Sequence, residues 1–190
     1  MVIAQLLSPV HALGPGNRVC LWTQGCSKNC KGCISPEMQP FTGNQVDENT
    51  LCRILRQVAV QGNCTGLTIS GGDPFEQSPA LFRLLTQVRE HFPDILVYTG
   101  YTLSAIQEGA AGEDGKACLS LIDVLIDGTY VEALNTPDCV LRGSRNQIIH
   151  YLNPAMQESY AAYMQQGRIL ESFVHRNNTI ITGIFNKENV

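Results

Sequence analysis

Three cysteines crowd into one short stretch of the sequence, and they are the residues whose type and spacing best suit chemistry. Cys26, Cys30 and Cys33 are spaced C-x3-C-x2-C directly after the apolar run at residues 18–22. Thiolates are soft ligands that bind iron in iron–sulfur clusters, and a short loop with glycine lets several sulfurs converge. Three cysteines would leave one iron of a four-iron cluster without a protein ligand. An open metal position is where chemistry can occur.

Two other interpretations of this loop are a structural zinc site and a disulfide. Zinc normally takes four ligands from paired C-x2-C knuckles, and this loop contains one such pair, so a distant cysteine would have to complete the site. A disulfide scaffold is typical of smaller, secreted chains with cysteines spread throughout. The cysteines outside the loop are expected to be small buried hydrophobic residues. They are Cys20, Cys52, Cys64, Cys118 and Cys139.

A second candidate site follows the apolar run at residues 67–70, where the sequence reads Ser-Gly-Gly-Asp-Pro. The pair Gly71 and Gly72 lets a ligand approach the backbone closely. The carboxylate of Asp73 can accept hydrogen bonds from an ammonium group. Taken alone, the same five residues also fit an ordinary turn.

Further candidates lie where other apolar runs end. Thr99 follows the run at residues 95–98, and Asp127 closes the run at residues 122–126. Ligands collect at the carboxyl ends of parallel strands in α/β folds, so both residues are candidate cofactor contacts. Asp127 fits a helix or turn cap equally well. The donor-rich segment 142–147 could bind a carboxylate or cap a turn.

The elements that must position these residues alternate along the chain. Strands are predicted at the four apolar runs, with amphipathic helices after Asp47 and over residues 78–88 and a short helix opened by Thr102. Residues 109–116 contain three glycines and no periodicity, so an irregular segment is expected there. This alternation predicts an α/β fold of mainly parallel strands covered by helices. Beyond residue 152, a helix and a hairpin turning at Asn177-Asn178 are predicted.

Composition narrows the class of protein. The chain has 190 residues, 44% of them hydrophobic and 16% charged, which fits one globular domain with a substantial core. A net charge of −4 argues against a protein that grips nucleic acid. No apolar run is long enough for a transmembrane helix, and no signal peptide pattern is visible, so a cytoplasmic location away from membranes is expected.

The cysteine loop and the Gly71-Gly72-Asp73 segment, in this order, resemble the radical S-adenosylmethionine (SAM) enzymes. In that superfamily three cysteines hold a [4Fe–4S] cluster, and the amine and carboxylate of SAM occupy the fourth iron. The reduced cluster cleaves SAM to methionine and a 5′-deoxyadenosyl radical. The resemblance implies Cys26, Cys30 and Cys33 as metal ligands and the glycine segment as the holder of the methionine amine. It implies no catalytic residue beyond the cluster and its ligands.

A closer resemblance covers about residues 8–152. Residues 14–18, 70–74, 99–101, 123–128, 142–144 and 146–147 occur in the order found in the activating enzymes of anaerobic (class III) ribonucleotide reductase. The resemblance implies a partial (β/α) barrel at residues 1–152, with residues 153–190 as an accessory helix and hairpin of the same domain. It also implies that the radical takes hydrogen from a glycine of the large reductase subunit, with a flavodoxin- or ferredoxin-type electron donor.

Three departures from the family pattern concern the substrate rather than the cluster. Ile34 stands where an aromatic residue is frequent, Arg145 stands where serine is usual, and the chain from Asn153 extends past the minimal family length. A radical SAM enzyme acting on another protein, a peptide or a small molecule is therefore one alternative function. A non-catalytic iron–sulfur electron carrier is another, but it would want a fourth cysteine nearby and no SAM pocket.

Overall fold

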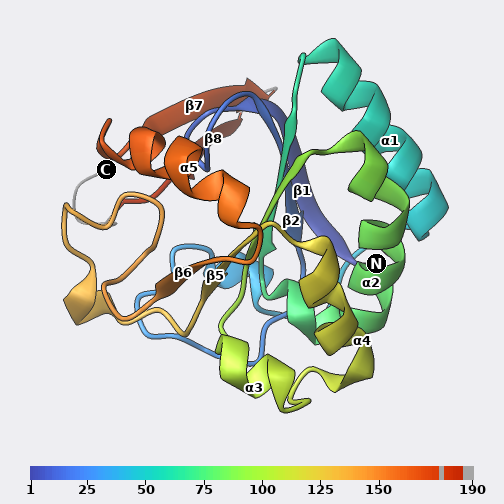
Figure 1. Ribbon diagram of the computed structural model, residues 1–190, viewed down its shortest axis with the longest axis horizontal. Helices are drawn as coiled ribbons and strands as arrows, with labels where there is room; N and C mark the ends of the chain where they lie inside the picture. The colour runs from blue at the N-terminus through green and yellow to red at the C-terminus, as the bar shows by residue number, and fades with distance from the viewer. Residues whose placement is uncertain (176–177, 186–190) are drawn as a thin grey trace.

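The computed structural model describes residues 1–175 and 178–185, and its largest element is a six-stranded sheet (Figure 1). The strands lie side by side in chain order. Strands β2 to β5 are parallel, whereas β1 and β6 run antiparallel to their neighbours at the two edges. The predicted α/β class with mainly parallel strands is thus confirmed. The strands are β1 (Ile3–Val10), β2 (Arg18–Thr23), β3 (Gly66–Gly71), β4 (Asp94–Tyr98), β5 (Val124–Asp127) and β6 (Ile148–Tyr151).

Five α-helices and a separate hairpin complete the described part of the chain. Asp47 caps the first helix, because its side chain accepts a hydrogen bond from the Thr50 amide at 3.0 Å. The helices are α1 (Glu48–Gln61), α2 (Ser78–Val88), α3 (Leu103–Gln107), α4 (Gly112–Cys118) and α5 (Gln157–Met164). The hairpin consists of β7 (Leu170–His175) and β8 (Asn178–Gly183), which pair antiparallel. No helix in residues 1–175 and 178–185 is long and apolar enough to cross a membrane.

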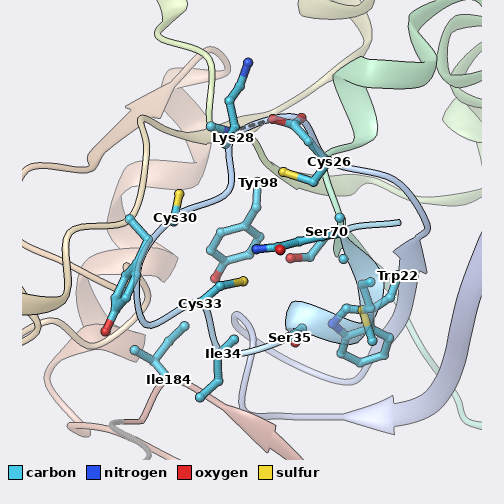
Figure 2. A pocket seen from close by; sticks show the side chains of 18 of the residues that line it. Trp22, Cys26, Lys28, Cys30, Cys33, Ile34, Ser35, Ser70, Tyr98 and Ile184 are labelled. Atoms are coloured by element: carbon cyan, nitrogen blue, oxygen red, sulfur yellow. Dashed lines mark hydrogen bonds between the residues drawn. The ribbon is translucent and has the colours of Figure 1, made fainter. Parts of the chain in front are cut away.

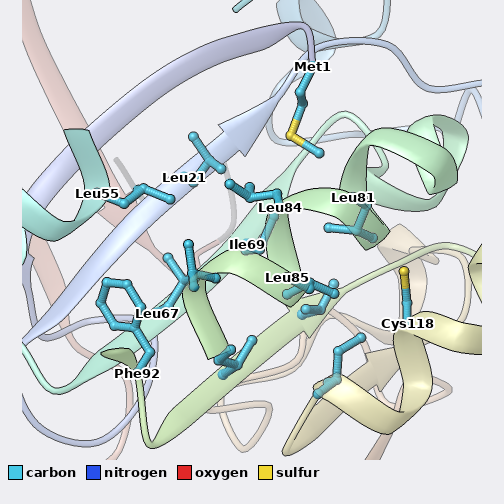
Figure 3. Packing of buried hydrophobic residues seen from close by; sticks show 14 of the residues in the cluster. Met1, Leu21, Leu55, Leu67, Ile69, Leu81, Leu84, Leu85, Phe92 and Cys118 are labelled. Carbon is cyan, nitrogen blue, oxygen red and sulfur yellow. The ribbon is translucent and has the colours of Figure 1, made fainter. Parts of the chain in front are cut away.

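The main core lies between the sheet and the helices that connect its parallel strands. Connections between neighbouring parallel strands are right-handed, so α1, α2 and α4 lie on the same face (Figure 1). Leucines from α1 and α2 pack there against residues of the strands, as Figure 3 shows. The fully buried members include Leu55, Leu81, Leu84 and Leu85 from helices and Leu21, Leu67 and Ile69 from strands.

The opposite face of the sheet is covered by α5 and the hairpin (Figure 1). Tyr160 and Tyr163 of α5 pack against Leu96 and the inward residues of β5. Phe173 of β7 packs over the end of β1 and over β2. The parallel strands are therefore buried on both faces, which explains why they read as nearly continuous apolar runs.

A buried ion pair ties α5 to the centre of the sheet. Arg18 of β2 is fully buried, and its guanidinium donates to the Asp94 carboxylate at 2.5 Å. The Tyr160 hydroxyl donates to the other oxygen of Asp94 at 2.8 Å. A buried charge is tolerated only when it is paired and hydrogen-bonded, so these three residues act as one unit.

Three elements differ from the sequence prediction. The antiparallel edge strands β1 and β6 were not predicted. The segment expected to be irregular contains α4. An added Cβ on Gly115 would collide with the Ala111 Cβ at the start of the same helix, so glycine is needed there for a close contact. The predicted hairpin is present, but Asn177 of its turn lies outside the described residues. Closure of the sheet into a partial barrel stays a prediction.

Candidate functional site

A cavity of about 460 Å³ opens at the carboxyl ends of β2, β3 and β4. The three loop cysteines line it together with the glycine segment after β3 and the residues after β4 (Figure 2). The structure thus brings together seven of the eight site residues proposed from sequence. They are Cys26, Cys30, Cys33, Gly71, Gly72, Asp73 and Thr99.

The cysteine loop is held in place by its backbone. The Gly25 amide donates to the Met38 carbonyl at 2.8 Å, and the Cys26 amide donates to the Gln39 carbonyl at 2.9 Å. Gly32 has a φ of 72°, a left-handed conformation that suits glycine. The three thiols are each partly exposed and free, so they are open to a ligand on the cavity side (Figure 2).

The donor set fits a multi-iron cluster, because three thiols line one cavity. Across residues 1–175 and 178–185, no three His, Cys, Asp or Glu side chains gather around one point closely enough to hold a single metal ion. In a [4Fe–4S] cube each thiolate binds a different iron, so the sulfurs surround a volume rather than a point. Three thiols around one cavity match that requirement.

Gly71 and Gly72 pack directly against the backbone at the start of the cysteine loop. Gly71 has a φ of 110°, and an added Cβ there would collide with the backbone of Thr23. An added Cβ on Gly72 would collide with the backbone of Gly25. The Gly72 amide donates to the Thr23 carbonyl at 2.8 Å, and the Asp73 amide donates to the Gly25 carbonyl at 2.8 Å. The close approach that requires glycine is therefore the approach of the loop that carries Cys26.

Asp73 is a buried carboxylate, and within the described residues one lone pair of its Oδ2 accepts no hydrogen bond. Its Oδ1 accepts from the Phe75 amide at 3.0 Å and from the Thr99 hydroxyl at 2.9 Å, and its Oδ2 accepts from the Gly100 amide at 2.9 Å. A carboxylate accepts about four hydrogen bonds, so Oδ2 has room for one more donor. Burial raises the pKa of Asp73 to about 6, although the three donors oppose that shift.

Lys28 fastens the cysteine loop to the neighbouring strand ends, a role that the sequence analysis missed. Its ammonium lies 3.2 Å from the centre of the Tyr101 ring and 3.7 Å from a carboxylate oxygen of Glu76. The same oxygen of Glu76 accepts from the Ser27 amide at 3.3 Å and from the Ser27 hydroxyl. A cation over an aromatic ring and beside a carboxylate is stabilised by both. The available signal was a lysine between two loop cysteines.

Asp127 is the eighth residue, and it lies outside the cavity lining. Its Oδ2 accepts from the Leu103 amide at the start of α3 at 2.6 Å and lies 2.9 Å from Nε2 of His150. Its carboxylate therefore caps a helix, which is the alternative that the sequence left open.

The donor-rich segment 142–147 is directed largely at its own loop. Arg142 donates to the Gln147 carbonyl at 3.1 Å, and the Gln147 side chain accepts from the Gly143 amide at 2.8 Å. Gln147 also donates to the Gly128 carbonyl at 2.8 Å. These bonds hold the segment after β5 at the cavity, so the turn-capping alternative explains these donors.

The cysteines outside the loop do not line the cavity. Cys20, Cys52, Cys118 and Cys139 are buried, and Cys64 is half-buried. Burial raises the pKa of Cys20 and of Cys118 to about 12 in each case. All eight cysteines are free, which contradicts the disulfide alternative.

Strand β8 and the two residues that follow it supply another part of the cavity lining. Ile184 and Ile34 both line the cavity (Figure 2). The sequence predicts this tail to be an accessory element with no part in the site. Nothing in the local pattern of a short hairpin signals which cavity it will border.

Comparison with known proteins agrees with these observations. Residues 12–150 match the family described as a 4Fe-4S single cluster domain. The anaerobic ribonucleoside-triphosphate reductase-activating protein of Escherichia coli (strain K12) is 35% identical over 153 residues, which cover 73% of this chain and 91% of that protein. The protein of the same name in Haemophilus influenzae is 35% identical, with 72% and 89% covered. Its counterpart in Enterobacteria phage T4 is 35% identical, with 70% and 83% covered.

Proposed function

The chain belongs to the family of anaerobic ribonucleoside-triphosphate reductase-activating proteins, and we propose that it installs a glycyl radical on the large subunit of an anaerobic ribonucleotide reductase. One observation carries the proposal: three cysteines at cluster spacing and a buried carboxylate line a single cavity at the carboxyl ends of parallel strands. Ligands bind at that edge of α/β sheets.

In this proposal Cys26, Cys30 and Cys33 hold a [4Fe–4S] cluster, and SAM binds beside it. When bound, the cluster supplies one electron that breaks the carbon–sulfur bond of SAM, giving methionine and a radical that takes a hydrogen atom from glycine. The protein's own part is to place the three thiols around the cavity and leave one iron open for SAM.

The residues after β3 and β4 orient SAM. The free lone pair on Oδ2 of Asp73 accepts a hydrogen bond from the methionine ammonium, while Thr99 and Gly100 hold the carboxylate still. Gly71 and Gly72 keep the loop with Cys26 against this carboxylate. Lys28 restrains the same loop from the other side, through Tyr101 and Glu76. Asp127 acts indirectly: its carboxylate accepts from the Leu103 amide and so fixes the start of α3.

The proposal includes a low-potential electron donor of the flavodoxin or ferredoxin type and a cytoplasmic location, where a reduced cluster survives. It also includes curvature of the sheet into a partial barrel. The electron-carrier alternative is less well supported, because a carrier has no need for a cavity and a buried carboxylate beside its cluster.

Reductive cleavage of SAM by the wild-type protein tests this chemistry without any partner. Anaerobically reconstituted protein with dithionite is expected to convert SAM to 5′-deoxyadenosine and methionine in equal amounts, measured by chromatography. A protein that carries the full complement of iron and sulfide but forms no 5′-deoxyadenosine would contradict the proposal.

A further inference from the structure

The hairpin contributes to the cavity from outside the segment that defines the family. The family match ends at residue 150, yet β8 begins at Asn178 and lines the same cavity as the loop cysteines. The lining residues of this segment are Thr179, Ile180, Ile181, Thr182, Gly183, Ile184 and Phe185. We call these seven residues the β8 wall.

Polar bonds fix this hairpin on both sides of the cavity. On one side, the Glu171 carboxylate accepts from the amides of His11 and Ala12, each at 2.7 Å. On the other side, the Asn135 side chain donates to the Phe185 carbonyl at 3.2 Å. Arg168 donates to the Asn135 side chain at 2.6 Å and so holds that contact in place. The hairpin therefore connects the β1–β2 turn with the loop after β5.

The two sides of the cavity differ in chemistry. The cysteine side includes Lys28, Glu37 and Asp73, which suits a cluster and a zwitterionic cofactor. Every residue of the β8 wall is uncharged. An uncharged wall at the rim of a charged site fits an uncharged polypeptide segment better than a second charged ligand, because charges left there without partners would be desolvated at a cost.

The wall also has the backbone geometry of a strand. Within the described residues β8 pairs with β7 alone, so one edge of β8 presents its amides and carbonyls outside that pairing. Such edges bind extended peptides by adding a strand, with affinity from the main chain and selectivity from alternate side chains. A glycine-bearing segment suits this mode, because its missing side chain lets the backbone come close.

We propose that the β8 wall binds the glycine-bearing segment of the partner reductase as an extended, uncharged chain and presents it to the cavity. The inference rests on the proposed function and adds to it the element that selects the substrate. Residues 12–150 then generate the radical, and the hairpin determines which polypeptide receives it.

The test compares two exposed positions on the same face of the hairpin. Thr179 lines the cavity, whereas Val174, its partner across the two strands, is 78% exposed and does not. Thr179→Lys is expected to weaken binding of the purified anaerobic reductase about tenfold and to lower the glycyl radical yield to match, since a lysine ammonium would be desolvated without a partner against an uncharged chain. Ile181→Lys is expected to act in the same direction. Val174→Lys is the matched control and should leave the radical yield at the wild-type level.

Three readouts separate the outcomes: reductase affinity, glycyl radical by electron paramagnetic resonance, and 5′-deoxyadenosine formed without reductase. Loss confined to the first two supports the wall as a substrate contact. Loss of 5′-deoxyadenosine in Thr179→Lys would assign the wall to SAM and overturn the inference. Equal losses in Thr179→Lys and Val174→Lys, or no loss in either, would also overturn it. A wild-type protein that forms no glycyl radical would instead contradict the proposed function.

Discussion

The segment matched by the family and the segment after it stabilise the same cavity in different ways. In residues 12–150 the site is built from many short internal bonds: Asp73 accepts three of them, and the glycine pair is hydrogen-bonded to the cysteine loop. In the described part of residues 153–185 the hairpin is held by bonds of Glu171 and Arg168 to other segments of the chain, and its cavity wall is uncharged.

This difference separates reaction from recognition. Radical chemistry requires cofactor atoms held to within fractions of an ångström, and a dense network of bonds to buried groups provides that order. Recognition of a polypeptide requires a surface that excludes water and matches an extended chain, which a hairpin can provide. Changes in the two segments should therefore affect different steps.

Loss of a loop cysteine should produce the largest effect. Cys30→Ala removes one of the three proposed iron ligands, and a cluster held by only three thiolates needs each of them in place. Iron content after reconstitution should therefore fall sharply, and the visible absorbance of the cluster should disappear. Cys52→Ala is the matched control, because Cys52 is buried in α1 beside the Gln87 carbonyl. Full cluster content in Cys30→Ala would contradict the assignment.

Asp73→Asn should change how stability depends on pH. The pKa of Asp73 rises on folding from 3.8 to about 6, so between those values the folded state holds a proton that the unfolded state has lost. The stabilising contribution is full below the unfolded pKa and is lost as pH rises through the folded pKa. Over this window the wild type should lose about 3 kcal/mol relative to Asp73→Asn, at about 1.4 kcal/mol per pKa unit.

Urea unfolding of both proteins across this pH range measures the difference between their free energies of unfolding. Hydrogen bonds altered by the amide add an offset that does not vary with pH, so the slope alone reports the titration of Asp73. A difference that stays constant from acid to neutral pH would show that Asp73 keeps an ordinary pKa in the folded protein.

Glu171→Gln should have the smallest effect, and only on the second segment. The amide keeps an acceptor for the His11 and Ala12 backbone but loses the charge, at a cost of about 1–2 kcal/mol. SAM cleavage should be unchanged, and the glycyl radical yield should fall a few-fold because the hairpin is held less firmly. Glu113→Gln, which breaks an exposed pair with Lys116, is the control and should change neither.

A fall in SAM cleavage equal to the fall in radical yield in Glu171→Gln would remove the distinction between the two segments. The hairpin would then stabilise the reaction site itself. Thermal unfolding of each variant shows whether a change in radical yield follows a change in overall stability.

The sequence predicted the parallel strands because burial on both faces leaves short apolar runs, and it predicted the main helices because one buried face leaves a periodic pattern. It missed β1 and β6, since edge strands pack on fewer neighbours and show weaker alternation. It treated the glycines around Gly115 as a sign of irregular structure, whereas glycine at this position avoids a collision with Ala111 at the start of α4. A glycine needed for close approach and a glycine in a flexible loop look the same in one sequence.

At the site, the sequence identified the residues whose chemistry is visible in their spacing. It offered no means to place Lys28 on Tyr101, because that contact joins the cysteine loop to the end of β4, far along the chain. Nor could it relate β8 to the cavity, since the relation depends on how the hairpin crosses the second face of the sheet. For Asp127 the sequence position suggested more than the structure shows. This carboxylate ends a strand, which is consistent with a ligand contact, but it caps helix α3.

Electron paramagnetic resonance on a mixture of reconstituted protein, SAM, reductant and purified anaerobic ribonucleotide reductase tests the central claim most directly. A glycyl radical doublet on the reductase should appear with the wild-type protein, disappear with Cys30→Ala, and be weaker with Thr179→Lys although 5′-deoxyadenosine still forms. Abundant 5′-deoxyadenosine from the wild-type protein, with no radical on the reductase, would show that this chain acts on a different substrate.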